Sequence, residues 1–236
     1  MKIRFMSYNI QTCHDFYSRE INVSGIAEVI RRMNADVIGL NEVRDEGPAE
    51  DYFSMAGQLA EELNMQFYFA RAVTFKSGPY GNAVLSRYPL SGLETHAIEN
   101  APKETCTRYF EPRCVLKAHL DAGRGADILV SHFGLNVSEQ ELAVKKVLEL
   151  KDRLAGPVVM MGDLNAQPHD AVLQPLFEAF SDTAAAAQEK LLTFPSDHPS
   201  IKIDYIFLSG GLSAEHVEVP PIIASDHLPY IADITL

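Results

Sequence analysis

The sequence predicts an α/β fold that forms one domain over residues 1–236. Short apolar runs, typical of buried strands, alternate along the chain with longer segments in which apolar residues recur at helical spacing. Apolar residues make up 47% of the chain and charged residues 22%, an ordinary balance for a globular protein. No linker, low-complexity stretch or sequence repeat divides the chain, and its length is enough to bury a core without disulfides or a structural metal.

The first half of the chain is expected to contain two helices among short strands. Lys2, Arg4 and Met6 alternate with Ile3, Phe5 and Ser7 in the first strand, which is the period of an extended backbone. The predicted strands cover residues 2–8, 36–40, 66–71, 80–86 and 111–120. Helical spacing of apolar residues predicts helices over residues 20–34 and about 52–64.

The second half repeats this alternation. Buried strands are predicted at 126–131 and 157–161, with an amphipathic helix at 139–154 between them that takes Ser138 as its N-cap. Residues 170–180 are expected to be helix and loop. The last elements are a hairpin of residues 202–208 and 211–218 around Ser209-Gly210-Gly211, a break at Pro220-Pro221 and a strand at 230–236.

Polar residues suited to chemistry recur at the ends of the predicted strands. They are Asn9, Glu42, His132, Asp163 with Asn165, Asp204, and Asp226 with His227. Each of them alone has a structural explanation, such as a turn, a solvated loop or a satisfied core histidine. Ligands and catalytic groups in layered α/β folds sit at strand ends and in the loops that follow, so the recurrence predicts one shared site.

The residue types at these positions predict metal-assisted hydrolysis. Glu42, Asp163 and Asp226 offer carboxylate oxygens, and Asn9 and Asn165 add amide oxygens. Such a set favours Mg²⁺, with Mn²⁺ as a substitute, over zinc. Asp204 and His227 would form an orienting dyad, in which the carboxylate fixes the tautomer of the ring and raises the basicity of its other nitrogen.

Seven motifs resemble, in the same order, those of the endonuclease/exonuclease/phosphatase superfamily. They are SYNI, GLNEV, YGNAVLSRYPL, SHFGLN, GDLNAQP, TFPSDHPSIKIDYIF and SDHLP, which together span nearly the whole chain. The resemblance implies a four-layer α/β/β/α sandwich of two mixed sheets flanked by helices, with the site at one mouth. It also implies hydrolysis of a phosphoester by an activated water.

The resemblance assigns a role to each residue of the metal site. Glu42 corresponds to the main metal ligand, with Asn9 beside it, and Asp226 would complete the inner shell or lie close to it. Gln11 stands where the abasic-site endonucleases of the superfamily carry Asp, and Asn41 stands where Gln is usual.

The remaining residues resemble the catalytic set of the superfamily. Asp163 and Asn165 correspond to the pair that aligns the water and the phosphoryl oxygens, and Asp204 with His227 corresponds to the general base. His132 resembles the histidine that supports the developing phosphorane or protonates the leaving group. The repair enzymes have Tyr at that position, and this chain also lacks Trp for a damage pocket. Deoxyribonuclease-like, sphingomyelinase-like and inositol-phosphate-like hydrolases are therefore favoured over DNA repair enzymes.

Two further residues are weaker candidates for substrate binding. Asn82, between a glycine and a strand, would contact a substrate phosphate or form a turn. Arg113, at the start of a strand, would bind phosphate or pair with Glu111.

The net charge of −12 argues against nucleic acid as the favoured partner, because affinity for a phosphate backbone comes mainly from Lys and Arg. The three cysteines form no CxxC pair, no apolar run approaches the roughly 18 residues of a membrane span, and no signal peptide is visible. A cytoplasmic monomer is expected, or a secreted or periplasmic protein if a signal peptide has been removed.

Three functions are consistent with the sequence. The first is a Mg²⁺-dependent phosphodiesterase or phosphatase on a small or lipid-derived phosphoester. The second is a nuclease of the same superfamily, which needs a basic groove for which the candidates are dispersed: Arg71, Lys76, Arg87, Lys103, Arg108 and Arg113. The third is a silent binding module, which would require loss of a core catalytic residue, and none is lost.

Overall fold

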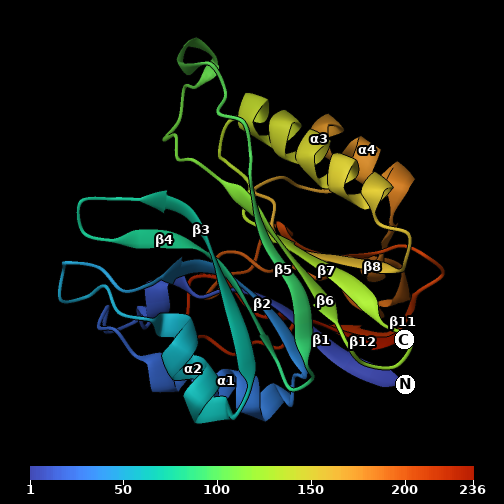
Figure 1. Cartoon of the computed structure of the whole chain (residues 1–236), viewed down its shortest axis with the longest axis horizontal. Coiled ribbons are helices and arrows are strands. Elements are labelled where there is room, and N and C mark those ends of the chain that lie inside the picture. The colour runs from blue at the N-terminus through green and yellow to red at the C-terminus, as the bar shows by residue number, and fades with distance from the viewer.

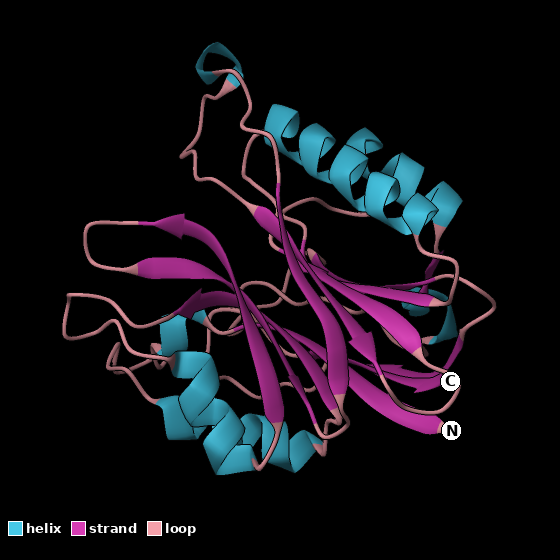
Figure 2. Ribbon diagram, viewed as in Figure 1, coloured by secondary structure: helices cyan, strands magenta, loops and turns pink.

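The strands pair into two six-stranded sheets in a computed structural model that describes residues 1–236 (Figures 1 and 2). The strand order is β11-β12-β1-β2-β4-β3 in the first sheet and β5-β6-β7-β8-β10-β9 in the second. One central pair in each sheet is parallel, β1 with β2 and β7 with β8, and all other pairs are antiparallel. Both sheets are therefore mixed.

The strands and helices have the following bounds. The first sheet consists of β1 Lys2–Asn9, β2 Val37–Arg44, β3 Gln66–Thr74, β4 Pro79–Ser86, β11 Ser213–Glu218 and β12 Tyr230–Thr235. The second consists of β5 Leu90–Ala97, β6 Cys114–Leu120, β7 Ala126–Ser131, β8 Val158–Asp163, β9 Ser181–Asp182 and β10 Asp204–Leu208. The α-helices are α1 Val23–Met33, α2 Met55–Leu63, α3 Val137–Arg153 and α4 Gln174–Ala179. Short 3₁₀ turns lie at Gln11–Cys13, Lys103–Thr105, Ala171–Leu173 and Thr183–Ala186.

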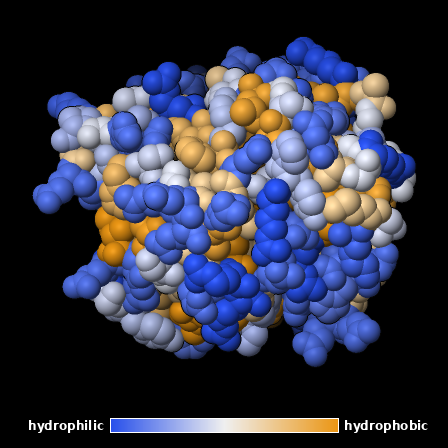
Figure 3. Space-filling view, turned by 60° about the horizontal axis from the view of Figure 1, so that its bottom comes forward, coloured by the Kyte–Doolittle hydropathy of each residue, from blue (hydrophilic) through white to orange (hydrophobic).

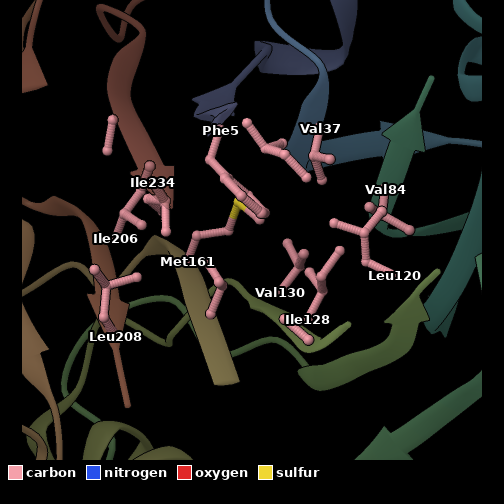
Figure 4. Packing of buried hydrophobic residues seen from close by; sticks show 14 of the residues in the cluster. Phe5, Val37, Val84, Leu120, Ile128, Val130, Met161, Ile206, Leu208 and Ile234 are labelled. Carbon is pink, nitrogen blue, oxygen red and sulfur yellow. The ribbon is translucent and has the colours of Figure 1, made fainter. Parts of the chain in front are cut away.

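Three hydrophobic clusters separate four layers. The largest lies between the two sheets and includes Phe5, Met161 and Ile206 (Figure 4). The second packs α1 and α2 on the outer face of the first sheet, and the third packs α3 and α4 on the outer face of the second sheet (Figure 1). The predicted α/β/β/α sandwich is confirmed.

The pattern of β1 shows why this sequence forms a strand covered on both faces. Ile3 and Phe5 belong to the cluster between the sheets, whereas Met6 and Tyr8 belong to the cluster under α1 and α2. Successive side chains of a strand point to opposite faces, so a central strand of a four-layer sandwich needs apolar residues on both.

One predicted contact is wrong. β10 and β11 do not form a hairpin, because β10 pairs with β8 and β9 while β11 pairs with β12 in the other sheet. Gly210 and Gly211, with φ of 68° and 73°, turn the chain from one sheet to the other. The turn signal was correct, but a turn does not determine which strand supplies the hydrogen-bond partner.

Two further differences concern element boundaries, and a third is a strand that was not predicted. α3 begins at Val137 after Asn136, whose backbone N–H donates to Glu139 Oε2 in a capping box, so Ser138 is not the N-cap. β2 continues through Asn41 and Glu42 to Arg44. β5 was not predicted, because most of its residues are exposed and the strand lies at the edge of its sheet.

None of the helices combines the length and apolar character that crossing a membrane would require. On the face seen in Figure 3, apolar groups lie in small areas between charged and polar side chains.

Candidate active site

The site forms where central strands of the two sheets end beside each other. Asn9 is the last residue of β1 and Asp163 is the last residue of β8. Asn9 Nδ2 donates to Asp163 Oδ2 over 3.1 Å and to Glu42 Oε1 over 3.0 Å. One buried amide therefore links the predicted metal site of the first sheet to the predicted catalytic residues of the second.

A β-bulge presents Glu42 to the site. The register of β2 against β4 shifts between Leu40 and Val43, and one extra residue is accommodated on β2. Glu42 has φ of 58°, in the left-handed region that non-glycine residues rarely adopt. Bulges of this kind redirect a side chain, and strained residues persist where the surrounding structure holds them.

Asp163 is held by an unusually close approach of β7 and β8. Gly162 has φ of 146°, and a Cβ at this position would lie 1.8 Å from the carbonyl oxygen of Ser131. The backbone N–H of Asp163 donates to Asn41 Oδ1 over 2.9 Å, and its Oδ1 accepts from the backbone N–H of Asn165 over 2.9 Å. Only glycine allows this approach, so the sequence Gly162-Asp163 fixes the carboxylate at the base of the site.

Asp204 and His227 form the predicted pair. Asp204 is the first residue of β10 and lies opposite Asp163 in the antiparallel register, so it starts a strand instead of ending one. His227, in the loop before β12, places Nδ1 at 2.8 Å from Asp204 Oδ2 and Nε2 at 3.5 Å from Asp163 Oδ2. A carboxylate placed at Nδ1 in this way fixes the orientation and the tautomer of the ring.

His132 follows β7 and approaches Asp163 from the other side. Its Nε2 lies 3.4 Å from Asp163 Oδ2 and 3.1 Å from Asn165 Nδ2. Asn165, with φ of 48°, also donates from Nδ2 to the carbonyl of Phe133 over 3.1 Å. The structure thus brings His132, Asp163 and Asn165 together.

Asp226 lies beside Glu42 and is held from two directions. Gln11 Nε2 donates to Asp226 Oδ2 over 3.0 Å, and Ser225 Oγ lies 3.2 Å from Asp226 Oδ1. Gln11 also donates from its backbone N–H to Asn9 Oδ1 over 3.0 Å. Gln11 therefore supports two of the three predicted ligands without adding a carboxylate of its own.

The two weaker candidates lie behind these residues. Asn82 is buried, accepts from Asn41 Nδ2 over 2.9 Å and donates to the carbonyl of Cys114 over 3.1 Å. Arg113 places Nη1 at 3.0 Å from Glu111 Oε1 and at 2.8 Å from His132 Nδ1. The pairing with Glu111 was one of the two roles considered for this arginine.

The charge states of the buried groups follow from their neighbours. Burial raises the pKa of Asp163 to about 7, although His227 acts in the opposite direction. Burial lowers the pKa of His227, but Asp204, Asp163 and Asp226 outweigh it and raise the pKa to about 10. Burial, Arg113 and His227 all lower the pKa of His132, to well below its ordinary value.

The chemistry of the donor set fits a hard divalent cation. Burial raises the pKa of Glu42, the hydrogen bond from Asn9 opposes this, and the nearby Asp226 carboxylate raises it further. These two carboxylates form no ion pair with a Lys or Arg, and such a pair would suit a divalent cation that prefers oxygen ligands. A second group, formed by Asp163, Asp204 and His227, has ligand atoms within 4.8 Å of one another.

Asn41 is a site residue that was not among the predicted ones. It is fully buried and connects Asp163 to Asn82 by the two hydrogen bonds given above. An Asn directly before Glu42, within an apolar run, was the available signal. An amide at such a position needs several buried partners.

The chain is similar to known proteins along nearly its whole length. The uncharacterized protein YbhP of Escherichia coli K12 is 23% identical over 256 residues, covering 99% of this chain and 96% of YbhP. An endonuclease/exonuclease/phosphatase structure from Beutenbergia cavernae has a TM-score of 0.76 at 23% identity and covers 100% of this chain and 72% of that one. A mannosyl-6-phosphatase of Bacteroides thetaiotaomicron has a TM-score of 0.76 at 14% identity, with coverage of 99% and 100%.

A family model described as the endonuclease/exonuclease/phosphatase family matches residues 6–227, which include Asn9, Asp163 and His227. Members of this family are generally hydrolases that act on phosphoesters. The resemblance seen in the sequence motifs is confirmed, and the chain belongs to the endonuclease/exonuclease/phosphatase family.

Proposed function

We propose that the protein is a divalent-metal-dependent phosphoester hydrolase that acts on a small phosphoester. The observation that carries this proposal is the continuous hydrogen-bonded cluster around Asp163. Its carboxylate contacts Asn9, His132 and His227, and Asn9 in turn contacts Glu42. The proposed metal site and the proposed proton-transfer site would thus share one buried centre, which supports hydrolysis of a phosphoester.

The metal ion would be held by the carboxylates of Glu42 and Asp226 and by the side-chain amide oxygen of Asn9. Asn9 Oδ1 accepts one backbone hydrogen bond and has a second lone pair for a cation. When bound, the cation would polarise the phosphate and offset the carboxylate charge that raises the pKa of His227.

Asp204 and His227 would supply the base. Asp204 accepts from Nδ1–H of the ring, which leaves Nε2 as the nitrogen that takes a proton from the attacking water. That nitrogen faces Asp163, so the water would lie between the two groups. Asp163 accepts from this water and directs its lone pair at phosphorus.

Asn165 and His132 would contact the phosphoryl oxygens on the opposite side of Asp163. The side chain of Asn165 is fixed by the carbonyl of Phe133, and His132 lies 3.4 Å from Asp163 Oδ2. Donors fixed before the reaction stabilise developing charge without reorganisation, which is the main source of catalysis in such sites.

The substrate is proposed to be compact because the basic residues do not supply a groove. Of the six candidates for such a groove, Arg87 is paired with Asp36 and Arg113 with the buried Glu111. The remaining four cations belong to a chain with a net charge of −12. A protein named as a mannosyl-6-phosphatase has this fold, so the fold accommodates a sugar phosphate.

Hydrolysis assays with and without EDTA test the proposal. Purified protein should hydrolyse bis-p-nitrophenyl phosphate, nitrophenyl phosphate or a sugar phosphate with Mg²⁺ or Mn²⁺, and lose activity with the chelator. Glu42→Gln should lose turnover and weaken Mg²⁺ binding at least about 100-fold in calorimetry. Glu94→Gln, at an exposed position on β5, is the matched control. Unchanged Mg²⁺ affinity in a folded Glu42→Gln protein would remove Glu42 from the site.

Binding to a short DNA duplex across a salt series tests the choice of substrate. An inactive Asp163→Asn variant with Mg²⁺ present should bind weakly, with a shallow salt slope, because few phosphates are neutralised. Sub-micromolar affinity with a slope of several units would instead identify the protein as a nuclease.

A further inference from the structure

Arg113 is almost fully covered and makes its contacts inside the protein. Its side chain is 11% exposed and that of Glu111 is 8% exposed. A single nitrogen, Nη1, reaches both Glu111 Oε1 at 3.0 Å and His132 Nδ1 at 2.8 Å. Arg113 precedes β6 and His132 follows β7, its antiparallel neighbour, so adjacent strands place the two side chains together.

The contact between Arg113 and His132 determines which ring nitrogen carries the proton. A guanidinium is always protonated and can only donate hydrogen bonds. His132 Nδ1 must therefore accept from Arg113, since a proton on Nδ1 would place two donors 2.8 Å apart at a buried position. The proton of the neutral ring is then on Nε2, which faces Asp163 Oδ2 at 3.4 Å.

Asn165 is the one neighbour that would favour the other tautomer. Its Nδ2 lies 3.1 Å from His132 Nε2, but the same amide group donates to the carbonyl of Phe133 over 3.1 Å. The Asn165 amide thus keeps a hydrogen bond in either case, whereas Arg113 would face a second buried donor. The contact with the charged guanidinium is the shorter and stronger of the two.

We propose that Arg113 is a positioning residue that holds His132 as the neutral Nε2–H tautomer, so that His132 stabilises the phosphoryl oxygens and does not protonate the leaving group. Only the second part, the role of His132 in catalysis, rests on the proposed function; the tautomer set by Arg113 does not. A neutral imidazole that protonated the leaving group would become an imidazolate anion. This step is far less favourable than proton transfer from an imidazolium, which leaves a neutral ring. The Nε2 proton therefore stays on the ring as a hydrogen-bond donor.

Nitrogen NMR of the histidine rings tests the tautomer without any assay of activity. In ¹⁵N-histidine-labelled protein at pH 7, the His132 signals, identified by their loss in His132→Gln, should show a protonated Nε2 and an unprotonated Nδ1. Replacing Arg113 and Glu111 together by Met removes the pair without leaving a buried carboxylate, and both tautomers should then be populated. Arg113→Lys should retain the wild-type pattern, as should Arg87→Met, a control at an arginine paired with Asp36.

A proton on Nδ1 in the wild-type protein, or on both nitrogens, would overturn the role of Arg113. So would an unchanged tautomer in the double variant. These results do not depend on finding a substrate.

Kinetics with two leaving groups test the second part. His132→Gln should reduce kcat for a nitrophenyl ester and for an alkyl ester by the same factor, on the order of 100-fold. The double Met variant should reduce kcat about 10- to 100-fold with little change in KM, and Arg113→Lys should restore most of it. A loss several-fold greater on the alkyl ester would show that His132 protonates the leaving group. If the wild-type protein hydrolyses neither ester, the proposed function fails, and the NMR result still decides the role of Arg113.

Discussion

His132 and His227 are chemically identical side chains in nearly identical positions relative to Asp163. They are 5% and 4% exposed, and their Nε2 atoms lie 3.4 Å and 3.5 Å from the same carboxylate oxygen. The far nitrogen of His132 contacts Arg113, whereas that of His227 contacts Asp204. The pKa of His132 is consequently lowered and that of His227 is raised to about 10.

The comparison shows that burial alone does not set the charge of a histidine. Burial lowers the pKa in both cases, so the difference comes from the charges around each ring. Arg113 and His227 lower the pKa of His132 further, whereas Asp204, Asp163 and Asp226 raise that of His227. A cation behind the ring disfavours its protonated form, which suits the donor role proposed for His132. A carboxylate behind the ring raises its affinity for a proton, which suits the role of base proposed for His227.

The largest expected effect comes from removing the carboxylate behind His227. Asp204→Asn should lower kcat on the order of 1,000-fold, because the ring loses the group that fixes its tautomer and supports its positive charge. The measurement is kcat as a function of pH, with whichever of the proposed phosphoesters the wild-type protein hydrolyses fastest. Asp127→Asn is a matched control, since Asp127 Oδ1 lies 3.2 Å from His119 Nδ1 in the same sheet, outside the site. Similar losses in both variants would mean that Asp204 has no special role.

A smaller effect is expected from moving His132 and Asp163 apart. Gly162→Ala requires a strained φ and a contact with the Ser131 carbonyl that cannot be accommodated, so it should lower the free energy of unfolding by about 3 kcal/mol. Chemical denaturation measures this change. Gly156→Ala, where a Cβ would meet nothing within 4 Å, should change stability by less than about 0.5 kcal/mol. Equal stability of the two variants would show that β7 and β8 tolerate separation at this point.

The most gradual effect, small over any one pH unit, is the pH dependence of stability in metal-free protein. The pKa of His227 rises from 6.5 in the unfolded chain to about 10 in the folded one. The contribution of His227 to the free energy of unfolding is therefore complete below pH 6.5. It is lost as the pH rises towards 10, by at most about 1.4 kcal/mol per pH unit.

The pKa of His132 is lowered instead, so wild-type protein should lose stability relative to His132→Gln as the pH falls below 6.5. Chemical denaturation in EDTA gives the free energy of unfolding of the wild-type protein, His227→Gln and His132→Gln at each pH. The difference between the wild type and each variant isolates one histidine, because the other titrating groups largely cancel. Differences that change in the same direction with pH would contradict the opposite roles of the two histidines.

Most residues of the site could be predicted from the sequence, because each stands at or next to the end of an apolar strand. Asn9 after β1 and Asp163 at the end of β8 are of this kind, and the structure brings them within hydrogen-bonding distance. Asn41 was not predicted as a site residue, because its position in an apolar run indicates a buried amide but not the partners of that amide. The bulge that redirects Glu42 was also missed, because it depends on how β2 pairs with β4.

The sequence by itself determined most of the strands and helices, the family and the chemical character of the donor set, because periodicity and residue type are local properties. Only the tertiary structure decided which sheet each strand joined, as the separation of β10 from β11 shows. It also decided that Arg113 lies behind one histidine and Asp204 behind the other. Strand partners and the electrostatics of buried groups depend on residues far apart in the chain, so no local pattern encodes them.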